Sequence, residues 1–577
     1  MPTEKSIYYL TVQTKTALHV GTTASADDVS DSLFRRDSQG RPVLPGTSIA
    51  GAIRSHLTRL APAMTGLYPR HICDALNITE KKDEQGNPLA CGCIICHLMG
   101  DIRPLNEVRG QNLPLDELER LNGRASRLII HDALIEPKQT HIRDGVGIDR
   151  TTGAAARAAS AKFDFETVPA DTDFVITLEL EDADEIDNYL LDLALYEWQE
   201  GRLRFGGNKS RGTGVLELTE IQQTTLNLNQ PGDLMKFLRR KDRELEKTRL
   251  NLPFNPPHRG YHDGYAHAKG SVQSWLTIDF DLQAKGFFLT NDTTQAIAKG
   301  YDHRSLFFLP GASLRGAIRS QAERIARTLV NLRDDVNSEA EFLKHCPAPN
   351  PFVTRGDKQN GIESSAARIR QQAPDRRIDA DSYDLSEQLF GSVDWGSRLA
   401  VEDAPLMDKP VWKKLDFVAI DRFTGGAADG AKFDASALWR PRFHCRLHLE
   451  TPQDWEIGWL LYVLKDMIDG RVPVGFGAAK GFVEVELDEK TLSLTLGYAY
   501  PDAAPLDGLP ADEDRFFLEA ASTDWEDINQ TGWLEAWNSK LDSYKVTVPH
   551  TQSRDPYWSA SVRQLYRKET TIYDLLK

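Results

Sequence analysis

Two stretches of this chain are near-copies of one another at an offset of 265 positions (44 to 309). Residues 44–55 read Leu-Pro-Gly-Thr-Ser-Ile-Ala-Gly-Ala-Ile-Arg-Ser, and residues 309–320 read Leu-Pro-Gly-Ala-Ser-Leu-Arg-Gly-Ala-Ile-Arg-Ser. Further pairs follow in the same order. Ile-Asp-Arg-Thr-Thr-Gly at 148–153 and Lys-Phe-Asp at 162–164 reappear as Ile-Asp-Arg-Phe-Thr-Gly at 420–425 and Lys-Phe-Asp at 432–434. Ordered repetition over this length predicts two copies of one folding unit.

The length of the chain agrees with a duplication. At 577 residues it exceeds what one hydrophobic core organises, and two domains of roughly 200 residues have ordinary sizes. We expect a first domain over 1–222, a linker over 223–270, a second domain over 271–488 and a C-terminal extension over 489–577. The extension contains Trp525, Trp533, Trp537 and Trp558. It is therefore expected to dock on an apolar surface, either of the second copy or of a partner subunit.

Composition places the chain among ordinary globular proteins. Its hydrophobic fraction is 40% and its charged fraction 27%, and no apolar run approaches the ~20 residues that cross a bilayer. The first residues lack the pattern of a secretory signal. We therefore expect a cytoplasmic protein with no membrane partner. The net charge of −16 argues at face value against a nucleic-acid partner, but both repeated motifs carry arginines, so a basic track on an acidic body is compatible with it.

Each copy is expected to begin with a strand, a loop and a helix. Residues 7–15 and 274–282 are rich in β-branched and aromatic side chains, which is typical of strands. After each Pro-Gly turn, apolar residues recur at the three-and-four spacing of an amphipathic helix. Ser48 or Ser313 is placed to cap that helix.

The remaining elements of each copy also correspond. Both copies are expected to end with a strand (174–180; 443–449), a helix (185–200; 455–469), a glycine-rich turn and a last strand (216–218; 485–487). This order predicts an α+β fold of two tandem ferredoxin-like (RRM-like) domains, each a sheet with helices on one face. Between the copies, residues 234–249 predict a charged helical stretch.

Two glycine features indicate close contact with another chain. Gly51 and Gly316 occupy the same helix-interior position in both copies, where glycine costs ~1 kcal/mol relative to alanine. Either a neighbouring strand or a nucleic-acid backbone must approach there. The glycine-rich loop at 205–215 adds Lys209 and Arg211, which suit phosphate. The second copy keeps Lys480 but not the arginine.

Four of the six cysteines cluster in the first copy. Cys91, Cys93 and Cys96 lie within six residues, with Cys73 and His71 upstream, whereas Cys346 and Cys445 stand alone. This arrangement predicts a tetrahedral structural zinc. His71 and Cys73 compete for the fourth position, and His97 is a lesser candidate. The alternative is a set of small apolar residues without a ligand.

The ordered motifs resemble those of the RAMP superfamily, and more closely the repeating backbone subunit of type III CRISPR effector complexes. The resemblance rests on Leu-Pro-Gly-x-Ser-x-x-Gly-x-x-Arg, Cys-x-x-Cys-x-Leu-Met-Gly-Asp at 93–101, Ser-Arg-Leu at 126–128, Ile-Asp-Arg-x-Thr-Gly, and Gly-Gly-x-x-Ser-Arg-Gly-x-Gly. It runs from about residue 7 to 488 and occurs twice. Two fused units are similar to the tandem subunits of type III-D assemblies.

The resemblance implies a protein that lies along a CRISPR guide RNA, beside a target RNA and other type III effector subunits. In each copy a palm would hold the guide backbone and a hairpin would act as a thumb between short guide–target segments. The residues implied in RNA binding are Ser48, Arg54, Arg150, Lys209 and Arg211 in the first copy, and Ser313, Arg319, Arg422 and Lys480 in the second. Arg150 and Arg422 could instead pair with a neighbouring carboxylate such as Asp149.

The family also implies cleavage of the target RNA, aided by a divalent cation such as Mg²⁺ or Mn²⁺. The family aspartate lies six residues before a second aspartate, ahead of the Pro-Gly turn, which selects Asp31 with Asp37 following. Asp27 and Asp28 are adjacent rivals, and all three could instead be solvated loop acids. His19 could aid proton transfer, although a lone histidine at a strand end is more often structural.

The second copy departs from this pattern. Counting back from Pro310, the position equivalent to Asp31 is Ala296. The loop offers Asp292, which matches Asp27, and Asp302, which matches Asp37. Cleavage by the second copy is therefore doubtful. Two other functions remain open: a structural guide-RNA scaffold without cleavage, and an endoribonuclease that processes the guide precursor by metal-free histidine chemistry.

Overall fold

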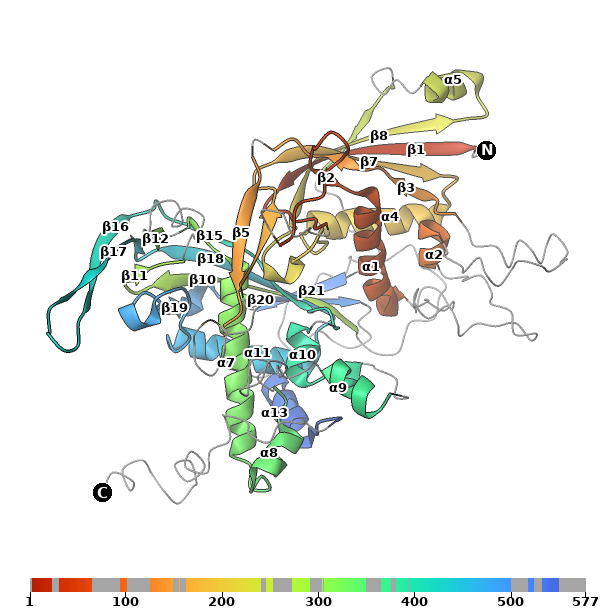
Figure 1. Ribbon diagram of the computed structural model, residues 1–577. Coiled ribbons are helices and arrows are strands. Elements are labelled where there is room, and N and C mark those ends of the chain that lie inside the picture. Colours follow the sequence, from red (N-terminus) through yellow and green to blue (C-terminus); the bar gives the residue numbers. More distant parts are fainter. Residues whose placement is uncertain are drawn as a thin grey trace.

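The protein is built from antiparallel sheets and helices arranged in two modules (Figure 1). The computed structural model describes residues 3–22, 31–64, 94–100, 125–137, 139–148, 155, 162–239, 245–252, 272–290, 303–304, 306–348, 365–374, 380–392, 394–499, 517–522 and 532–548. Within these residues, no helix is both long and apolar enough to cross a membrane. The mixture of strands and helices that the sequence predicts is confirmed.

The first module centres on a sheet whose strands lie in the order β3-β7-β1-β8-β9. Its strands are β1 (Glu4–Thr14), β3 (Leu128–Ile130), β7 (Asp173–Glu181), β8 (Leu216–Asn227) and β9 (Thr248–Leu250). Its helices are α1 (Gly46–Met64), α2 (Ile94–Met99) and α4 (Glu185–Gln199). A separate hairpin, which we call the thumb, pairs β5 (His141–Val146) with β6 (Lys162–Thr167), and β2 (Val43–Leu44) pairs with β4 (Ala133–Leu134).

Alternation along β1 decides which face of this sheet carries the helices. Leu10 and Val12 point into the core and are fully buried, together with Ile49, Ile53 and Leu57 of α1. These helix positions follow the predicted three-and-four spacing. The sheet and the two long helices therefore share one apolar layer, with α1 and α4 on the same side of the sheet (Figure 1).

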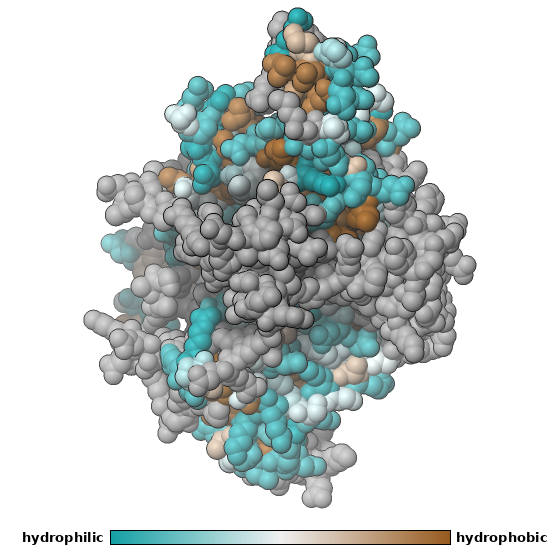
Figure 2. Space-filling model, turned by 90° about the vertical axis from the view of Figure 1, so that its right-hand side faces the viewer, coloured by the Kyte–Doolittle hydropathy of each residue, from teal (hydrophilic) through white to brown (hydrophobic). Residues whose placement is uncertain are grey.

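The opposite face of the first sheet is covered by the segment that follows β8. Helix α5 spans Pro231–Arg239, and β9 pairs with β8, so the predicted helix over 234–249 is wrong over 245–249. Phe237 packs on Ile7 and Tyr9 of the sheet. Tertiary packing overrides helix propensity here, because Leu250 joins the partly buried residues around the first core. Brown apolar surface remains at the top of Figure 2, where α5 lies.

The second module repeats the strand order as β14-β18-β10-β20-β21. Its sheet strands are β10 (Val272–Ala284), β14 (Leu399–Val401), β18 (Arg442–Glu450), β19 (Val485–Leu487), β20 (Ser493–Ala499) and β21 (Phe517–Ser522). Its helices are α7 (Gly311–Asn331), α8 (Glu339–His345), α9 (Ser365–Gln372), α10 (Leu385–Phe390), α11 (Asp454–Ile468) and α13 (Trp533–Ser543). Its thumb hairpin joins β16 (Trp412–Ile420) to β17 (Ala427–Trp439), and short strands are β11 (Phe287–Phe288), β12 (His303–Arg304), β13 (Phe308–Leu309) and β15 (Ala404–Pro405).

The last strand differs between the modules. In the first module β8 runs for 12 residues beside β1 with one register shift. In the second, β19 and β20 pair with β10 in turn and are separated by the short turn Glu489–Thr491. The elements after residue 488 therefore extend the second sheet.

The described part of the C-terminal extension packs on the second module. Trp533 and Trp537 of α13 are buried in its core, and the Trp537 ring stacks on Trp459 of α11 with centroids 4.5 Å apart. Gly458 lets the backbone of α13 approach, because a Cβ there would lie 2.0 Å from the Trp533 carbonyl oxygen. Of the two expected docking surfaces, the second copy is the one these tryptophans contact.

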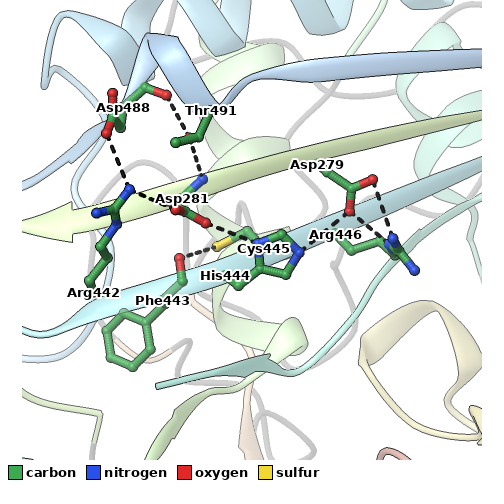
Figure 3. A network of polar contacts seen from close by, with 9 residues as sticks. All are labelled: Asp279, Asp281, Arg442, Phe443, His444, Cys445, Arg446, Asp488 and Thr491. Carbon is green, nitrogen blue, oxygen red and sulfur yellow. Dashed lines mark hydrogen bonds and ion pairs between the residues drawn. The ribbon is translucent and has the colours of Figure 1, made fainter. Parts of the chain in front are cut away.

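The side of the second sheet that faces away from its helices carries a ladder of cross-strand ion pairs between β10 and β18 (Figure 3). Asp279 lies 2.7 Å from Arg446, and Asp281 lies 2.8 Å from Arg442 and 2.9 Å from His444. Directly opposed residues of opposite charge stabilise antiparallel pairs. Cys445 points the other way into the core, where burial raises the pKa of its thiol.

Ion pairs join the two modules along one junction. Arg143 and Arg204 of the first module lie 2.6 Å from Asp403 and Glu402 of the second, respectively. Arg59 also pairs with Glu450. Every cation in this set comes from the first module and every anion from the second, so the junction is electrically complementary and fixes the two modules side by side.

Candidate nucleic-acid interface and acidic loop

The two long helices begin in the same way, but not as predicted. Helices α1 and α7 start at Gly46 and Gly311, so Ser48 and Ser313 lie inside the first turn and do not cap it. The prediction of serine caps is therefore wrong.

The first helical amides are satisfied from elsewhere in the fold. The Gly46 amide donates to the Asp132 carboxylate at 2.8 Å, and the Gly311 amide donates to Asp403 at 2.9 Å. Because each aspartate follows β3 or β14 and is distant in sequence, local pattern reading could not find it.

The repeated glycines of these helices face outward. Gly51 and Gly316 are exposed, and a Cβ built at either position would meet no described atom within 4 Å. The described part of the chain therefore does not supply the neighbouring strand that was one explanation for these glycines. The approach of an external backbone to this face of the helix stays a prediction.

The glycine-rich loops place their cations on thumb phenylalanines in both modules. The Arg211 guanidinium lies 5.1 Å from the centroid of Phe163. At the equivalent place the Lys480 ammonium lies 4.3 Å from Phe433 and 5.3 Å from Phe417. Such cation–π contacts hold a cation at the base of each thumb while leaving its charge available.

Two predicted cations meet across the module junction. The loop that carries Lys209 and Arg211 packs on α7, and the positive charge of Arg319 acts on Arg211. Desolvation and Arg319 lower the pKa of Arg211, whereas desolvation and Arg59 lower the pKa of Lys209. Arg319 is in addition paired with the Glu323 carboxylate at 2.8 Å. Gly212 permits this approach of the loop, because a Cβ at its position would lie 2.3 Å from Asp403 Oδ1. Its φ of +99° also favours glycine.

Arg54 and Arg319 also support the fold. Arg54 donates to the carbonyls of Met99 (3.4 Å) and Gly100 (3.0 Å), and Arg319 donates to Gly391 (3.1 Å). Each arginine thereby covers the C-terminal end of the short helix α2 or α10. Their role in RNA binding stays a prediction.

The tip of the second thumb is exposed. Arg422 is solvent-exposed and Phe423 is 100% exposed. The Asp421 carboxylate accepts the amides of Phe423 (2.8 Å) and Thr424 (2.9 Å), and these hydrogen bonds lower its pKa. Arg150 of the first thumb, with Asp149, lies outside the described residues.

The acidic loop of the first module is fastened to the thumb strand β6. The Asp31 amide donates to Asp164 Oδ1 at 2.8 Å, and the Asp164 amide donates to Asp31 Oδ2 at 3.0 Å. This reciprocal pair fixes the Asp31 carboxylate at the junction of palm and thumb. Asp27, Asp28, Asp292 and Asp302 lie outside the described residues.

Glu166 anchors the rest of this loop. Its buried carboxylate accepts the Phe34 amide at 2.8 Å and the Arg36 and Thr140 side chains at 2.5 Å each. Burial raises the pKa of Glu166, but these donors outweigh it and hold the pKa below its usual value. The Glu166 amide also donates to the Ser32 carbonyl at 2.9 Å.

His19 lies beneath the loop rather than at its surface. Only 5% of it is exposed; its Nδ1 lies 2.7 Å from the Glu166 carbonyl and its Nε2 lies 3.3 Å from Ser32 Oγ. Burial lowers the pKa of His19 despite the hydrogen bond to Glu166. With both ring nitrogens engaged, His19 acts as a structural support of the loop.

Of the predicted zinc ligands, the structure describes one. Cys96 is buried, and the Arg54 Nη2 lies 3.1 Å from its sulfur. His71, Cys73, Cys91 and Cys93 lie outside the described residues.

His97, the lesser candidate, lies in another cluster. Its Nδ1 is 3.0 Å from Asp187 and 3.8 Å from Asp184. The Arg127 guanidinium lies 2.6 Å from Asp187, so this group is already charge-compensated. In the second module Arg398 pairs with Glu456 in the same way, without a histidine. The arginine of the Ser-Arg-Leu motif therefore fixes the start of α4 or α11.

Comparison with known proteins decides the family. The RAMP superfamily model matches residues 11–217 and 293–483, which is more than half of the chain. The chain belongs to the RAMP superfamily. It is also similar to the CRISPR system Cms endoribonuclease Csm3 of Methanocaldococcus jannaschii, with 26% identity over 276 residues, covering 42% of this chain and 94% of that protein.

Several site residues of this RAMP protein were not assigned from sequence. Phe163 and Asp164, with Phe433 and Asp434, belong to the repeated Lys-Phe-Asp motif, which was recognised as a repeat but given no role. The repetition of this motif was the feature of the sequence that could have indicated a role for these residues. Glu166 had none, because the equivalent residue of the second copy is Ser436.

Proposed function

We propose that this chain is a guide-RNA-binding backbone subunit of a type III CRISPR effector complex in the cytoplasm, and that its first module cleaves the guide-paired target RNA. The observation that carries RNA binding is the duplicated surface of each module. In both, an outward-facing glycine on the long helix accompanies a loop cation held on a thumb phenylalanine. Phosphates bind to backbone amides and to cations of this kind.

Each module fits a ferredoxin-like unit. The order β8-β1-β7-β3, with α1 following β1 and α4 following β7, is the strand order 4-1-3-2 of that fold. In the second module β14, β18, β10 and the pair β19/β20 take the same places. Two equal units side by side would present consecutive stretches of one RNA strand with equivalent contacts.

The cations at the junction would continue the track between units. Arg211 of the first loop and Arg319 of α7 interact across the junction, and Lys209 lies nearby. A phosphate there would pair with the cations of the loop, whereas Glu323 already compensates Arg319. Arg54, Arg150, Arg422 and Lys480, with the helix starts at Ser48 and Ser313, extend the proposed contacts over both modules.

Cleavage is assigned to the first module because its acidic loop is anchored. The Asp31 carboxylate is exposed and is fixed by Asp164, and carboxylate oxygens are the ligands that Mg²⁺ or Mn²⁺ prefers. When bound, a divalent cation would neutralise charge on the scissile phosphate. Asp31 would hold that cation or orient the attacking 2′-hydroxyl, with Asp27 and Asp28 as neighbouring acids. For the second module Asp292 and Asp302 are the available acids.

A structural zinc in the first module is the second proposed metal. Cys96 fits, since it is buried and its sulfur faces a guanidinium. Cys73, Cys91 and Cys93, or His71 in place of Cys73, would complete four ligands. The metal would tie together the segment around α2.

Other type III effector subunits are the proposed protein partners. At the far end of the second module, Asp466 pairs with Gln321 (2.5 Å) and Arg471 (3.4 Å), and the Arg471 side chain is 65% exposed. The equivalent residues of the first module are covered by the second module. This end is therefore suited to contact with a further subunit.

The proposal is tested by crosslinking the assembled complex to its guide RNA and identifying the adducts by mass spectrometry. Adducts are expected within 205–215 and 474–485. A complex in which this polypeptide carries no guide adduct contradicts the proposal. The precursor-processing alternative predicts cutting of precursor RNA by the isolated protein in chelator, whereas the proposed function predicts none.

A further inference from the structure

We propose that Asp164, in thumb strand β6, is a positioning residue that holds the Asp31 carboxylate in place for target cleavage. This inference rests on the proposed function and adds a residue that neither the motif spacing nor the family comparison assigns. Asp164 acts through Asp31 and is not itself assigned to the RNA or to a cation.

The reciprocal hydrogen bonds carry the inference. One bond runs from the Asp164 amide to Asp31 Oδ2 (3.0 Å), and the other runs from the Asp31 amide to Asp164 Oδ1 (2.8 Å). The first bond fixes the carboxylate and the second fixes the backbone that carries it. A residue held at both points has a defined position and direction, which a solvated loop acid does not have.

The thumb strand that carries Asp164 is itself anchored. Two residues further on, Glu166 accepts the Phe34 amide and the Arg36 side chain and donates its own amide to Ser32. The segment from 31 to 36 therefore runs along β6 with contacts at both ends. Asp164 orients only the residue at the open end of this segment.

The second module supplies a matched contrast. Asp434 occupies the equivalent place in the repeated Lys-Phe-Asp motif, yet it lies 2.9 Å from the Lys414 ammonium, within its own hairpin. The second loop joins its thumb differently, by parallel pairing of Arg304 in β12 with Ser436 in β17. The reciprocal hydrogen bonds between two aspartates are therefore described in the first module, whose loop has the family spacing.

Positioning has a specific kinetic signature. In-line attack of a 2′-hydroxyl depends on the placement of the assisting group, and small displacements slow the reaction strongly. Asp164 follows Phe163 in the thumb, but its hydrogen bonds go to Asp31 and not to a cation of the track, so its loss should leave RNA affinity unchanged. The expected effect falls on the cleavage step alone.

The test uses the assembled complex and single-turnover cleavage of a guide-matched target RNA in Mg²⁺. Asp164→Ala removes the acceptor of the Asp31 amide and is expected to slow cleavage about 10-fold, with unchanged target affinity. Asp164→Asn keeps the backbone donor and a side-chain oxygen acceptor, so it is expected to stay within about threefold of wild type. Asp434→Ala is expected to cleave at the wild-type rate.

Asp31→Ala is measured alongside to separate the two proposals. Loss of cleavage in Asp31→Ala with a wild-type rate in Asp164→Ala overturns the positioning role alone. An Asp164→Asn rate as low as that of Asp164→Ala also overturns it, because the carboxylate charge would then be needed directly. Wild-type cleavage by Asp31→Ala overturns both proposals. Equal thermal denaturation midpoints confirm that these substitutions leave the fold intact.

Discussion

Each module carries a trio of polar side chains at equivalent positions near the ends of its helices, but only the trio of the first module is enclosed. In the first module the buried Glu197 lies 2.8 Å from Arg202 and 3.0 Å from His56. In the second, Asp466 lies 3.4 Å from Arg471, and Gln321 replaces the histidine. The side-chain exposure of the arginine is 5% in the first trio and 65% in the second.

The difference arises from what covers each trio. The Arg202 guanidinium lies 4.3 Å from the ring of Trp275, which belongs to the second module, so the junction itself excludes water from the first trio. The positive charge of Arg202 then outweighs burial and lowers the pKa of Glu197 to about 2. A sequence repeat thus preserves a chemical group, whereas its energetic role depends on whether another module docks on it.

The largest expected effect is on the enclosed trio. Glu197→Gln removes the nearest counter-charge of the buried Arg202 and leaves it only Glu200 at 3.8 Å, and breaking such a buried pair typically costs about 3–5 kcal/mol. Asp466→Asn, the matched change at the exposed trio, should cost less than about 1 kcal/mol. Chemical denaturation with hydrogen exchange of α4 and α11 measures both. Equal losses at the two sites would show that the junction does not enclose the first trio.

A smaller, pH-dependent effect is expected at Asp192 in α4. Burial raises the pKa of its carboxyl to about 6, and the equivalent residue of the second module is the buried Leu461. Folding therefore favours the protonated acid, and stability contributed by this group falls as pH rises from about 4 to about 6.

Asp192→Asn removes this titration. The variant should gain on the order of 1–3 kcal/mol relative to wild type above pH 6, and the gain should shrink toward pH 4. Denaturation midpoints across pH 4–8 measure the difference. Leu461→Asn in the other module is the contrasting change, and it should destabilise at every pH. A gain that does not vary with pH would contradict the assignment to Asp192.

The smallest expected effect is on guide binding by the two loop cations. Arg211→Ala and Lys480→Ala each remove one proposed phosphate contact, so each should weaken guide affinity several-fold and lower the salt slope by about 1. Filter binding at several salt concentrations measures this. Glu486→Ala changes a charge of the second module outside the proposed RNA contacts and serves as the control. Equal affinity for all three variants would remove the loops from the interface.

Much of the fold could be predicted from local pattern. The strand–helix order, the spacing of buried residues in α1 and the equivalence of the copies all follow from periodicity and repetition. The helix starts could not, because their acceptors Asp132 and Asp403 come from distant strands. The predicted helix over 234–249 was too long, because pairing of β9 with β8 outweighed the helical composition of that stretch.

The candidate site was only partly visible in the sequence. The family spacing selected Asp31, but the partners that hold Asp31 and its loop, Asp164 and Glu166, are more than 130 positions away and are joined by folding. Arg54 shows the converse limit: a repeated arginine that the family resemblance assigns to RNA binding holds the end of a helix. Repetition in the sequence identifies residues with a role, and the structure shows which contacts they make.

The central claim is that the two modules lie along one guide, with an active loop in the first. It is tested most directly by mapping cuts in a guide-matched target RNA at single-nucleotide resolution. Complexes carry the wild-type chain, Asp31→Ala, or Asp292→Ala with Asp302→Ala. We predict that Asp31→Ala loses one cut that the double variant retains. An unchanged set of fragments from the Asp31→Ala complex would contradict the account.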